Sequence, residues 1–203
     1  MSACHARAVV GASLLTLFAG CAATKPPAIY ILGDTGAPRP GVSSRTGLPV
    51  LEVMTVTVPD YLDTTDIMRR TGPNQVKASG TGQWGERLSV GVTDALAARL
   101  ALLLPGDMIV KTEPAKPAPR LQVQIEQFDI APDGSCTITA SWQVLSSNHA
   151  NVLATERGTF PATATTRDDA AVAAALSQAV THLANQIAST LKKVPTPPAR
   201  RTL

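Results

Sequence analysis

Residues 121–144, LQVQIEQFDIAPDGSCTITASWQV, decide the fold class of this chain. Apolar and polar residues alternate over residues 121–125 and again over residues 136–144, which is typical of strands with one buried face. Asp133-Gly134 lies between them and is a hairpin turn signal. The stretch therefore predicts two antiparallel strands joined by a tight turn.

The first strand of this hairpin carries an irregularity. Its apolar phase slips by one place after residue 125. A β-bulge near Glu126 or Gln127 would explain the slip, because a bulge adds one residue to one strand of a pair. A second turn at residues 147–149 then predicts a third antiparallel strand over residues 152–160.

Two other segments repeat their apolar residues every three or four positions. The first covers residues 88–103 and is also rich in alanine, which favours a helix. The second begins near Asp168 and Asp169 and ends at Lys192 and Lys193. Acidic residues at the start of a helix and basic residues at its end suit the helix dipole. Both segments are therefore predicted helices.

Shorter strands are predicted on the N-terminal side of these elements and between them. Residues 50–58, VLEVMTVTV, are nearly all β-branched or apolar, as expected of a strand buried inside a sheet. Residues 29–32 and 108–111 are short apolar runs, and residues 67–70 and 75–78 give weak strand signals.

Together these elements predict an α+β fold in a single domain. The expected architecture is one mixed, mostly antiparallel β-sheet with two long amphipathic helices packed on one face. Burial of about five apolar side chains per helix, at roughly 1.5–3 kcal/mol each, would hold both helices on the sheet.

Residues 80–85, GTGQWG, match the pattern G-x-G-x-x-G and precede the first helix. A dinucleotide site needs a hydrophobic strand before this pattern and an acidic residue about 20 positions later, at the end of the next strand. Residues 74–79 are polar, and Asp107 lies before the next strand. The pattern therefore predicts a flexible turn that leads into the helix, and no nucleotide cofactor.

The N-terminus has the features of a secretion signal. Residues 8–19 are apolar and follow Arg7, but they are fewer than the roughly 20 residues needed to span a bilayer. Residues 17–21, LFAGC, resemble the bacterial lipobox, although Phe18 stands where leucine is usual. We therefore expect Cys21 to be lipidated, with palmitate among its acyl chains. The alternatives are a plain cleavable signal with an incidental cysteine, or a retained membrane helix.

The residue after the lipidation site bears on the destination of the protein. It is Ala22 and not aspartate. By resemblance to the sorting rules of enteric bacteria, this implies a lipid anchor on the periplasmic face of the outer membrane.

Four regions are expected along the chain. Residues 1–20 are the lipoprotein signal peptide, and residues 21–48 are the lipidated cysteine and a Pro/Gly-rich tether with one short strand. Residues 49–194 are the α+β domain, and residues 195–203 are a disordered basic tail.

Composition limits the classes of partner. Without residues 1–20, 183 residues remain, enough for one domain with a sizeable core. This mature chain carries 17 Lys and Arg residues against 15 Asp and Glu residues, and aromatic residues make up 3% of the full chain. Nucleic-acid binders show a concentrated basic face, and base stacking needs aromatic residues. We therefore expect no nucleic-acid partner.

The residues of the mature chain do not favour catalysis or metal binding. Once Cys21 is acylated, Cys136 is the single remaining cysteine, and its place in a strand predicts a small buried residue. His149 and His182 lie far apart, so no histidine, cysteine and carboxylate cluster suits a metal. No G-x-S-x-G motif is present. We expect no enzyme, no metal and no cofactor.

Residues 56–62, VTVPDYL, belong to a wider set of matching positions. The others are Cys21, residues 29–32, Met68-Arg69-Arg70, Asn74, residues 84–88, residues 104–106, Phe128, Asp133-Gly134 and Trp142. In these residues, which are spread over most of the mature chain, the sequence resembles the paraquat-inducible protein C family. The members of this family are the auxiliary lipoproteins of ABC-type, MCE-domain lipid transport systems. Arg87, where the family often has proline, and the long Pro-rich linkers and tail depart from the pattern.

The resemblance implies a non-enzymatic accessory subunit in the outer membrane. It implies a partner with an MCE domain that bridges the periplasm, assembly into a homo-oligomeric cap, and a role in lipid traffic and envelope integrity with phospholipid as a candidate ligand. The alternative is a structural or assembly lipoprotein that binds another envelope protein or peptidoglycan and has no role in lipid transport.

Five residues are candidates for partner binding. Tyr61 and Leu62 follow a proline that ends a strand, and Trp84 lies in a Gly-rich segment; aromatic residues in loops are frequent binding anchors. Arg69 and Arg70 suit lipid phosphate or an acidic partner. The alternatives are that Tyr61, Leu62 and Trp84 cover the edge of the sheet, and that the two arginines are solvated on a strand.

Overall fold

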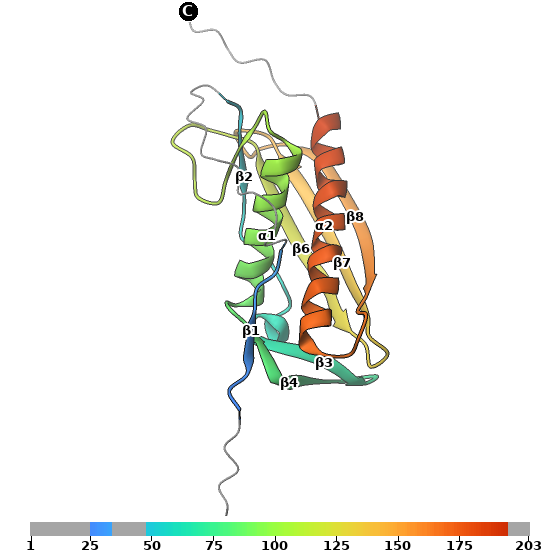
Figure 1. Cartoon of the computed structure of the whole chain (residues 1–203). Coiled ribbons are helices and arrows are strands. Elements are labelled where there is room, and N and C mark those ends of the chain that lie inside the picture. The colour runs from blue at the N-terminus through green and yellow to red at the C-terminus, as the bar shows by residue number, and fades with distance from the viewer. Residues whose placement is uncertain (1–24, 34–47, 195–203) are drawn as a thin grey trace, which may run out of the picture.

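The computed structural model describes residues 25–33 and 48–194, which form a single α+β domain (Figure 1). The predicted fold class is confirmed, but the strands divide between two sheets where one sheet was expected. Four predicted features lie wholly or partly outside the described residues: the signal peptide over residues 1–20, Cys21, the tether over residues 21–48 and the tail over residues 195–203.

The larger sheet has five strands in the order β5-β2-β6-β7-β8. β6, β7 and β8 are antiparallel, whereas β2 pairs in parallel with both β5 and β6. The hairpin at Asp133-Gly134 and the bulge between Ile125 and Gln127 are as predicted. The strand bounds are Val50–Val53 for β2, Met108–Val110 for β5, Arg120–Ile130 for β6, Ser135–Leu145 for β7 and Val152–Thr163 for β8.

The smaller sheet has three strands in the order β1-β4-β3 and crosses one end of the domain (Figure 1). Its strands are β1 (Ala28–Tyr30), β3 (Asp66–Gly72) and β4 (Gln75–Trp84). The G-x-G-x-x-G segment is therefore mostly strand, and the predicted flexible turn is wrong. The correction has a physical reason, because the backbone of this segment pairs with β1, and its glycines allow a helix to approach closely.

Both predicted helices form, as α1 (Leu88–Leu103) and α2 (Asp169–Lys193), and they lie side by side on one face of the larger sheet (Figure 1). The carboxylate of Asp168 caps α2 by accepting the N–H of Ala171 at 2.9 Å. The opposite face of the sheet is open and polar, with exposed side chains such as Gln122, Gln124 and Gln143.

The core lies between the larger sheet and the helices. Trp142 is 1% exposed, and its indole N–H donates to the hydroxyl of Thr190 on α2 at 3.3 Å. Cys136 is fully buried, as predicted for a small core residue, and burial raises the pKa of its thiol. The helices are therefore fastened mainly by apolar packing.

β2 is shorter than the predicted strand over residues 50–58. It ends at Val53, because the N–H of Val56 turns away from the sheet and donates to the hydroxyl of Thr93 on α1 at 2.8 Å. The chain rejoins β6 through a single bridge between Thr57 and Gln124. The helix thus ends the strand early by taking one of its backbone donors.

Candidate functional site at the three-stranded sheet

All five residues predicted for partner binding lie at or beside the three-stranded sheet. Arg69 and Arg70 are on β3, Trp84 ends β4, and Tyr61 and Leu62 belong to a short 3-10 turn, η1 (Asp60–Leu62), that precedes β3. The structure therefore brings residues from three separate elements to one end of the domain.

Trp84 and Leu62 are core residues. They are 5% and 3% exposed, respectively. The N–H of Trp84 donates to the carbonyl of Thr65 at 2.7 Å, and the next N–H, of Gly85, donates to the carbonyl of Tyr30 at 2.7 Å. These two hydrogen bonds fix the junction between β4 and α1. The side chains of Trp84 and Leu62 both pack into the core. A role for them in partner binding stays a prediction.

Tyr61 is the exposed member of the aromatic candidates, at 51%. The turn in η1 closes when the N–H of Leu62 donates to the carbonyl of Pro59 at 2.8 Å, which points Leu62 inward and leaves Tyr61 outside. The same turn presents the carboxylate of Asp63 to the N–H of Ser89 at 3.0 Å, at the start of α1.

Arg69 pairs with a carboxylate that was predicted only to suit the helix dipole. Its Nη2 and Nε lie 2.7 and 3.2 Å from Oδ1 of Asp169, the first residue of α2. The other oxygen, Oδ2, accepts the hydroxyls of Thr81 at 2.6 Å and Ser79 at 2.7 Å. The Asp169 side chain is only 2% exposed, so this cluster joins the small sheet to the helix.

The electrostatics of this cluster favour the charged carboxylate. Burial by itself would raise the pKa of Asp169, but the hydroxyls of Thr81 and Ser79 and the guanidinium of Arg69 outweigh it. The pKa of Asp169 is therefore held below its ordinary value, and the side chain is ionised at neutral pH.

The backbone of β4 bulges to enclose Asp169. Asp66 of β3 pairs with Gln83 and Met68 pairs with Ala78, so two steps along β3 match five steps along β4. A Cβ atom added to Gly82 would lie 2.7 Å from Oδ2 of Asp169 and 2.7 Å from Cε2 of Tyr30. Only glycine fits this approach, and the glycines at residues 80–85 were the sequence signal for it.

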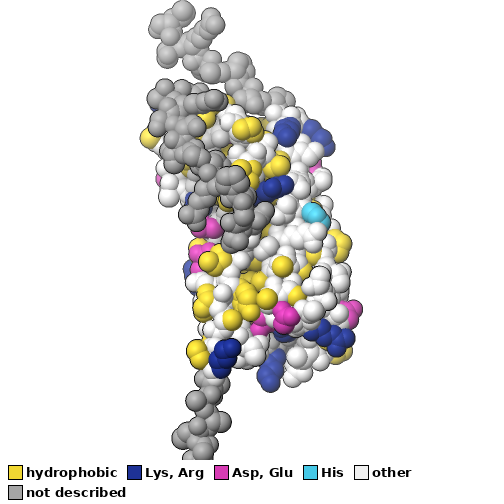
Figure 2. Space-filling model, viewed as in Figure 1, with side chains coloured by type: hydrophobic (Ala, Val, Ile, Leu, Met, Phe, Trp, Pro, Cys, Tyr) yellow, Lys and Arg dark blue, Asp and Glu magenta, His cyan; other side chains and the backbone are white. Residues whose placement is uncertain are grey.

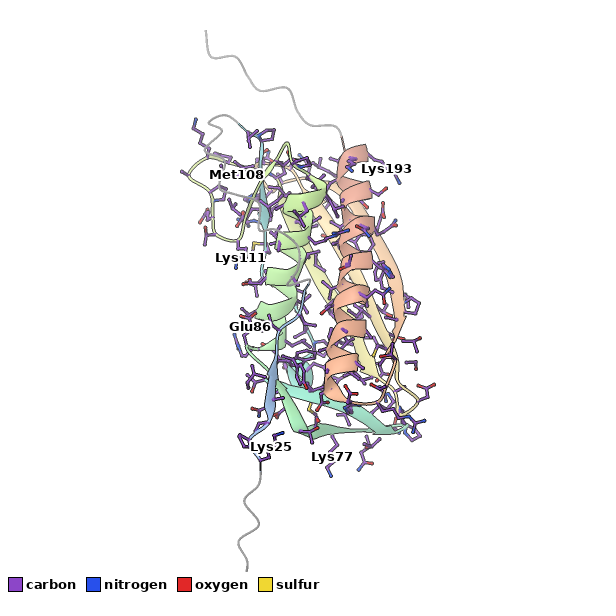
Figure 3. The ribbon with its side chains drawn as sticks, in the orientation of Figure 1. Lys25, Lys77, Glu86, Met108, Lys111 and Lys193 are labelled. Atoms are coloured by element: carbon purple, nitrogen blue, oxygen red, sulfur yellow. The ribbon has the colours of Figure 1, made fainter. Side chains whose placement is uncertain are left out.

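Arg70 ties the same hairpin to the larger sheet. Its Nε lies 2.8 and 2.9 Å from the two carboxylate oxygens of Asp129 on β6, and its Nη1 donates to the carbonyl of Pro73 at 2.9 Å. Both arginines that were predicted to meet a partner therefore have partners within the chain. Exposed cations at this end of the described residues include Lys25 and Lys77, which point away from the body in Figure 3.

The sequence prediction missed the outward face of β1. Ile29 and Ile31 are 62% and 63% exposed, whereas Tyr30 is half-buried and Leu32 is buried. Figure 2 shows apolar side chains gathered on the half of the molecule that carries this strand. The alternation of inward and outward residues was the available signal, but the run IYIL is apolar on both faces and gave no direction.

A shallow depression lies between β1 and the start of α1. Tyr30, Leu32, Trp84 and Leu88 are among its lining residues, and its cavity volume is only about 10 Å³. Small-molecule sites usually enclose roughly 300–1,000 Å³. The candidate site at this end is therefore a surface and not a pocket.

Within residues 25–33 and 48–194, no group of three or more His, Cys, Asp or Glu side chains is placed to hold a metal ion. None of the helices described there is both long enough and apolar enough to cross a bilayer.

The sequence matches a known family over most of its length. Residues 30–188 fit the profile of a family described as "ABC-type transport auxiliary lipoprotein component". No protein of curated function is significantly similar in sequence.

Crystal structures that share the fold include the following two. One is of an uncharacterized protein, with 18% identity and a TM-score of 0.69 over 82% of this chain and 99% of that chain. The other is of a Xanthomonas campestris protein of the DUF330 family, with 18% identity and a TM-score of 0.62 over 81% of this chain and 91% of that chain. At these identities the likeness establishes the fold alone.

Proposed function

We propose a function from one premise: the chain belongs to the family of ABC-type transport auxiliary lipoprotein components. Membership confirms the resemblance to paraquat-inducible protein C that the sequence indicated. The family description names an accessory component of a transporter and not an enzyme.

The protein acts as a lipid-anchored accessory subunit of an MCE-type lipid transport system, on the periplasmic face of the outer membrane. The observation that carries this proposal is the family match over residues 30–188, which starts nine residues after the lipobox cysteine, Cys21. The acyl chains on Cys21 supply the membrane attachment, because each buried methylene contributes about 0.8 kcal/mol.

The domain performs this role through contact of its surface with other proteins. The depression beside β1 is smaller than an ordinary ligand site, so the protein works through its surfaces. Of the two aromatic candidates, Tyr61 is exposed and can contact an MCE-domain partner, whereas Trp84 is buried.

Assembly into a homo-oligomer belongs to the same proposal. β8 is a strand of twelve residues at the edge of the larger sheet, and its outer side pairs with no strand of the described residues. Open edges of this length favour association with another chain. Light scattering on the detergent-solubilised protein measures the number of copies.

Copurification from membranes tests the function. We expect the full-length protein, cross-linked in cells and extracted in detergent, to bring down a protein with an MCE domain together with transporter subunits. The Tyr61→Ala variant should recover less of this partner, and Gln143→Ala, an exposed change on the larger sheet, is the matched control.

The Cys21→Ser variant tests the anchor separately. It should leave the membrane fraction, because the thiol that carries the acyl chains is gone.

The copurification experiment also has an outcome that contradicts the proposal. Repeated recovery of the wild-type protein without any MCE-domain protein contradicts the transport role. Recovery of peptidoglycan or of an unrelated envelope protein in its place supports the structural alternative.

A further inference from the structure

Two isoleucines turn outward at the edge strand β1: Ile29 lies in the strand, and Ile31 lies just beyond its end. Ile29 and Ile31 are more than half exposed, whereas most large aliphatic side chains of the described residues are buried. Their side chains rest on Gly85, where an added Cβ would lie 3.4 Å from each of them. They therefore form a supported apolar ridge on the surface, which has a cost in water unless something covers it.

The position of this ridge along the chain limits how far it lies from the lipidation site. Lys25 is four residues after Cys21, and Ile29 is eight residues after it. An extended chain advances at most about 3.6 Å per residue, so Lys25 lies within about 14 Å of Cys21 and Ile29 within about 29 Å. An acylated Cys21 therefore keeps β1 close to the bilayer surface.

Two lysines at this end suit a bilayer with anionic lipids. Lys25 precedes the ridge, and Lys77 on β4 is exposed at the same end of the domain (Figure 3). Basic residues near a membrane surface are attracted to anionic headgroups. Protein segments that lie in the membrane–water interface usually combine apolar side chains with basic ones.

We infer that the outward surface at β1, formed by Ile29 in the strand and by Lys25 and Ile31 on either side of it, lies against the lipid headgroup region. This orientation rests on the proposed anchoring at Cys21. It places the three-stranded sheet next to the membrane and turns the opposite end of the domain, where β8 begins, toward the periplasm.

Site-directed spin labelling tests the orientation in the full-length, acylated protein. Cys21 is acylated and Cys136 is fully buried, so a cysteine introduced on the surface is the reactive thiol. Ile29→Cys and Ile31→Cys are labelled one at a time. Val152→Cys is the matched control, because Val152 is 55% exposed and pairs with Leu145 at the end of β7 remote from the small sheet.

The labelled proteins are reconstituted in vesicles of phosphatidylethanolamine with a minority of phosphatidylglycerol. Collision of the label with oxygen, which concentrates in the acyl region, is compared with collision with a water-soluble nickel chelate. We expect the oxygen-to-nickel ratio at positions 29 and 31 to be several-fold higher than at position 152.

Flotation of the same vesicles separates the two claims. If the protein floats but the labels at positions 29 and 31 match the label at position 152, the orientation is wrong and the anchored function stands. Labels that are immobilised but reached by the nickel chelate would indicate a protein contact and also overturn the orientation. If the acylated protein does not float, the anchor itself fails, and the orientation fails with it.

Discussion

The five-stranded sheet and the three-stranded sheet are attached to α2 by different kinds of contact. The larger sheet meets the helix through buried apolar side chains such as Trp142, Leu176 and Leu183. The smaller sheet meets it through Arg69, Ser79 and Thr81, all bound to the carboxylate of Asp169.

This difference predicts different responses to change. Apolar packing depends on volume and is insensitive to pH, whereas a buried carboxylate depends on charge and on the exact placement of its donors. The small sheet, which carries the proposed membrane contact, can therefore be loosened without the loss of the main core. Three experiments break or sharpen the comparison.

Truncation of Trp142 should have the largest effect. Trp142→Ala removes a fully buried ring between β7 and α2, and we expect a loss of about 3–5 kcal/mol in the free energy of unfolding. Denaturant unfolding followed by circular dichroism measures it. Trp142→Phe, which keeps most of the volume, should lose much less, and equal losses in the two variants would argue against packing as the cause.

An alanine at Gly82 should have an intermediate effect that starts in the small sheet. The new Cβ would meet Oδ2 of Asp169 and the ring of Tyr30 at 2.7 Å, and such overpacking costs about 1–3 kcal/mol. Hydrogen exchange should show faster opening of β3 and β4 than of β7.

Gly80→Ala is the matched control for this experiment. It lies two residues away on the same strand, and a Cβ there meets nothing within 4 Å. A change at Gly80 as damaging as the one at Gly82 would show that the enclosure of Asp169 is not the reason.

Acid should have the smallest effect and should act first on the small sheet. The pKa of Asp169 in the folded protein is below its ordinary value of 3.8, so its stabilisation is complete above about pH 5. As the pH falls through 3.8, the unfolded chain takes up the proton first, and the stabilisation is lost progressively down to the pKa of the folded protein.

Asp169→Asn isolates this contribution from other carboxylates with lowered pKa values, such as Asp63 and Asp168. The variant should be weaker at neutral pH but should lose less stability between pH 5 and the acid limit, as measured by hydrogen exchange in β3 and β4. A wild type and a variant with parallel pH profiles would exclude Asp169 as the acid-sensitive group.

Local patterns in the sequence were sufficient for much of the fold. The periodicity over residues 88–103 and the run from Asp169 to Lys193 gave both helices within a residue or two of their bounds. The turn at Asp133-Gly134 and the slip near Glu126 were found because each depends on neighbours in the chain.

The candidate site was much less predictable. Two adjacent arginines such as Arg69 and Arg70 are typical of a site that binds an anionic partner. In the structure they bind carboxylates of the same chain, which lie 100 and 59 residues away in the sequence. The position of Asp169 predicted an acidic residue that suits the helix dipole, but its oxygens bind Arg69, Ser79 and Thr81 of the small sheet. Side-chain pairing over such separations has no period that a single sequence displays.

The sequence by itself determined the α+β class, the positions of the helices and the main hairpin, and the cysteine expected to carry the anchor, because these follow from the order of neighbouring residues. Tertiary structure alone decided that the strands separate into two sheets, that Leu62 and Trp84 are buried, and that Ile29 and Ile31 are exposed. The reason is that apolar runs such as residues 29–32 fit either face of a strand, and only packing against α1, α2 and β4 selects which side chains point outward.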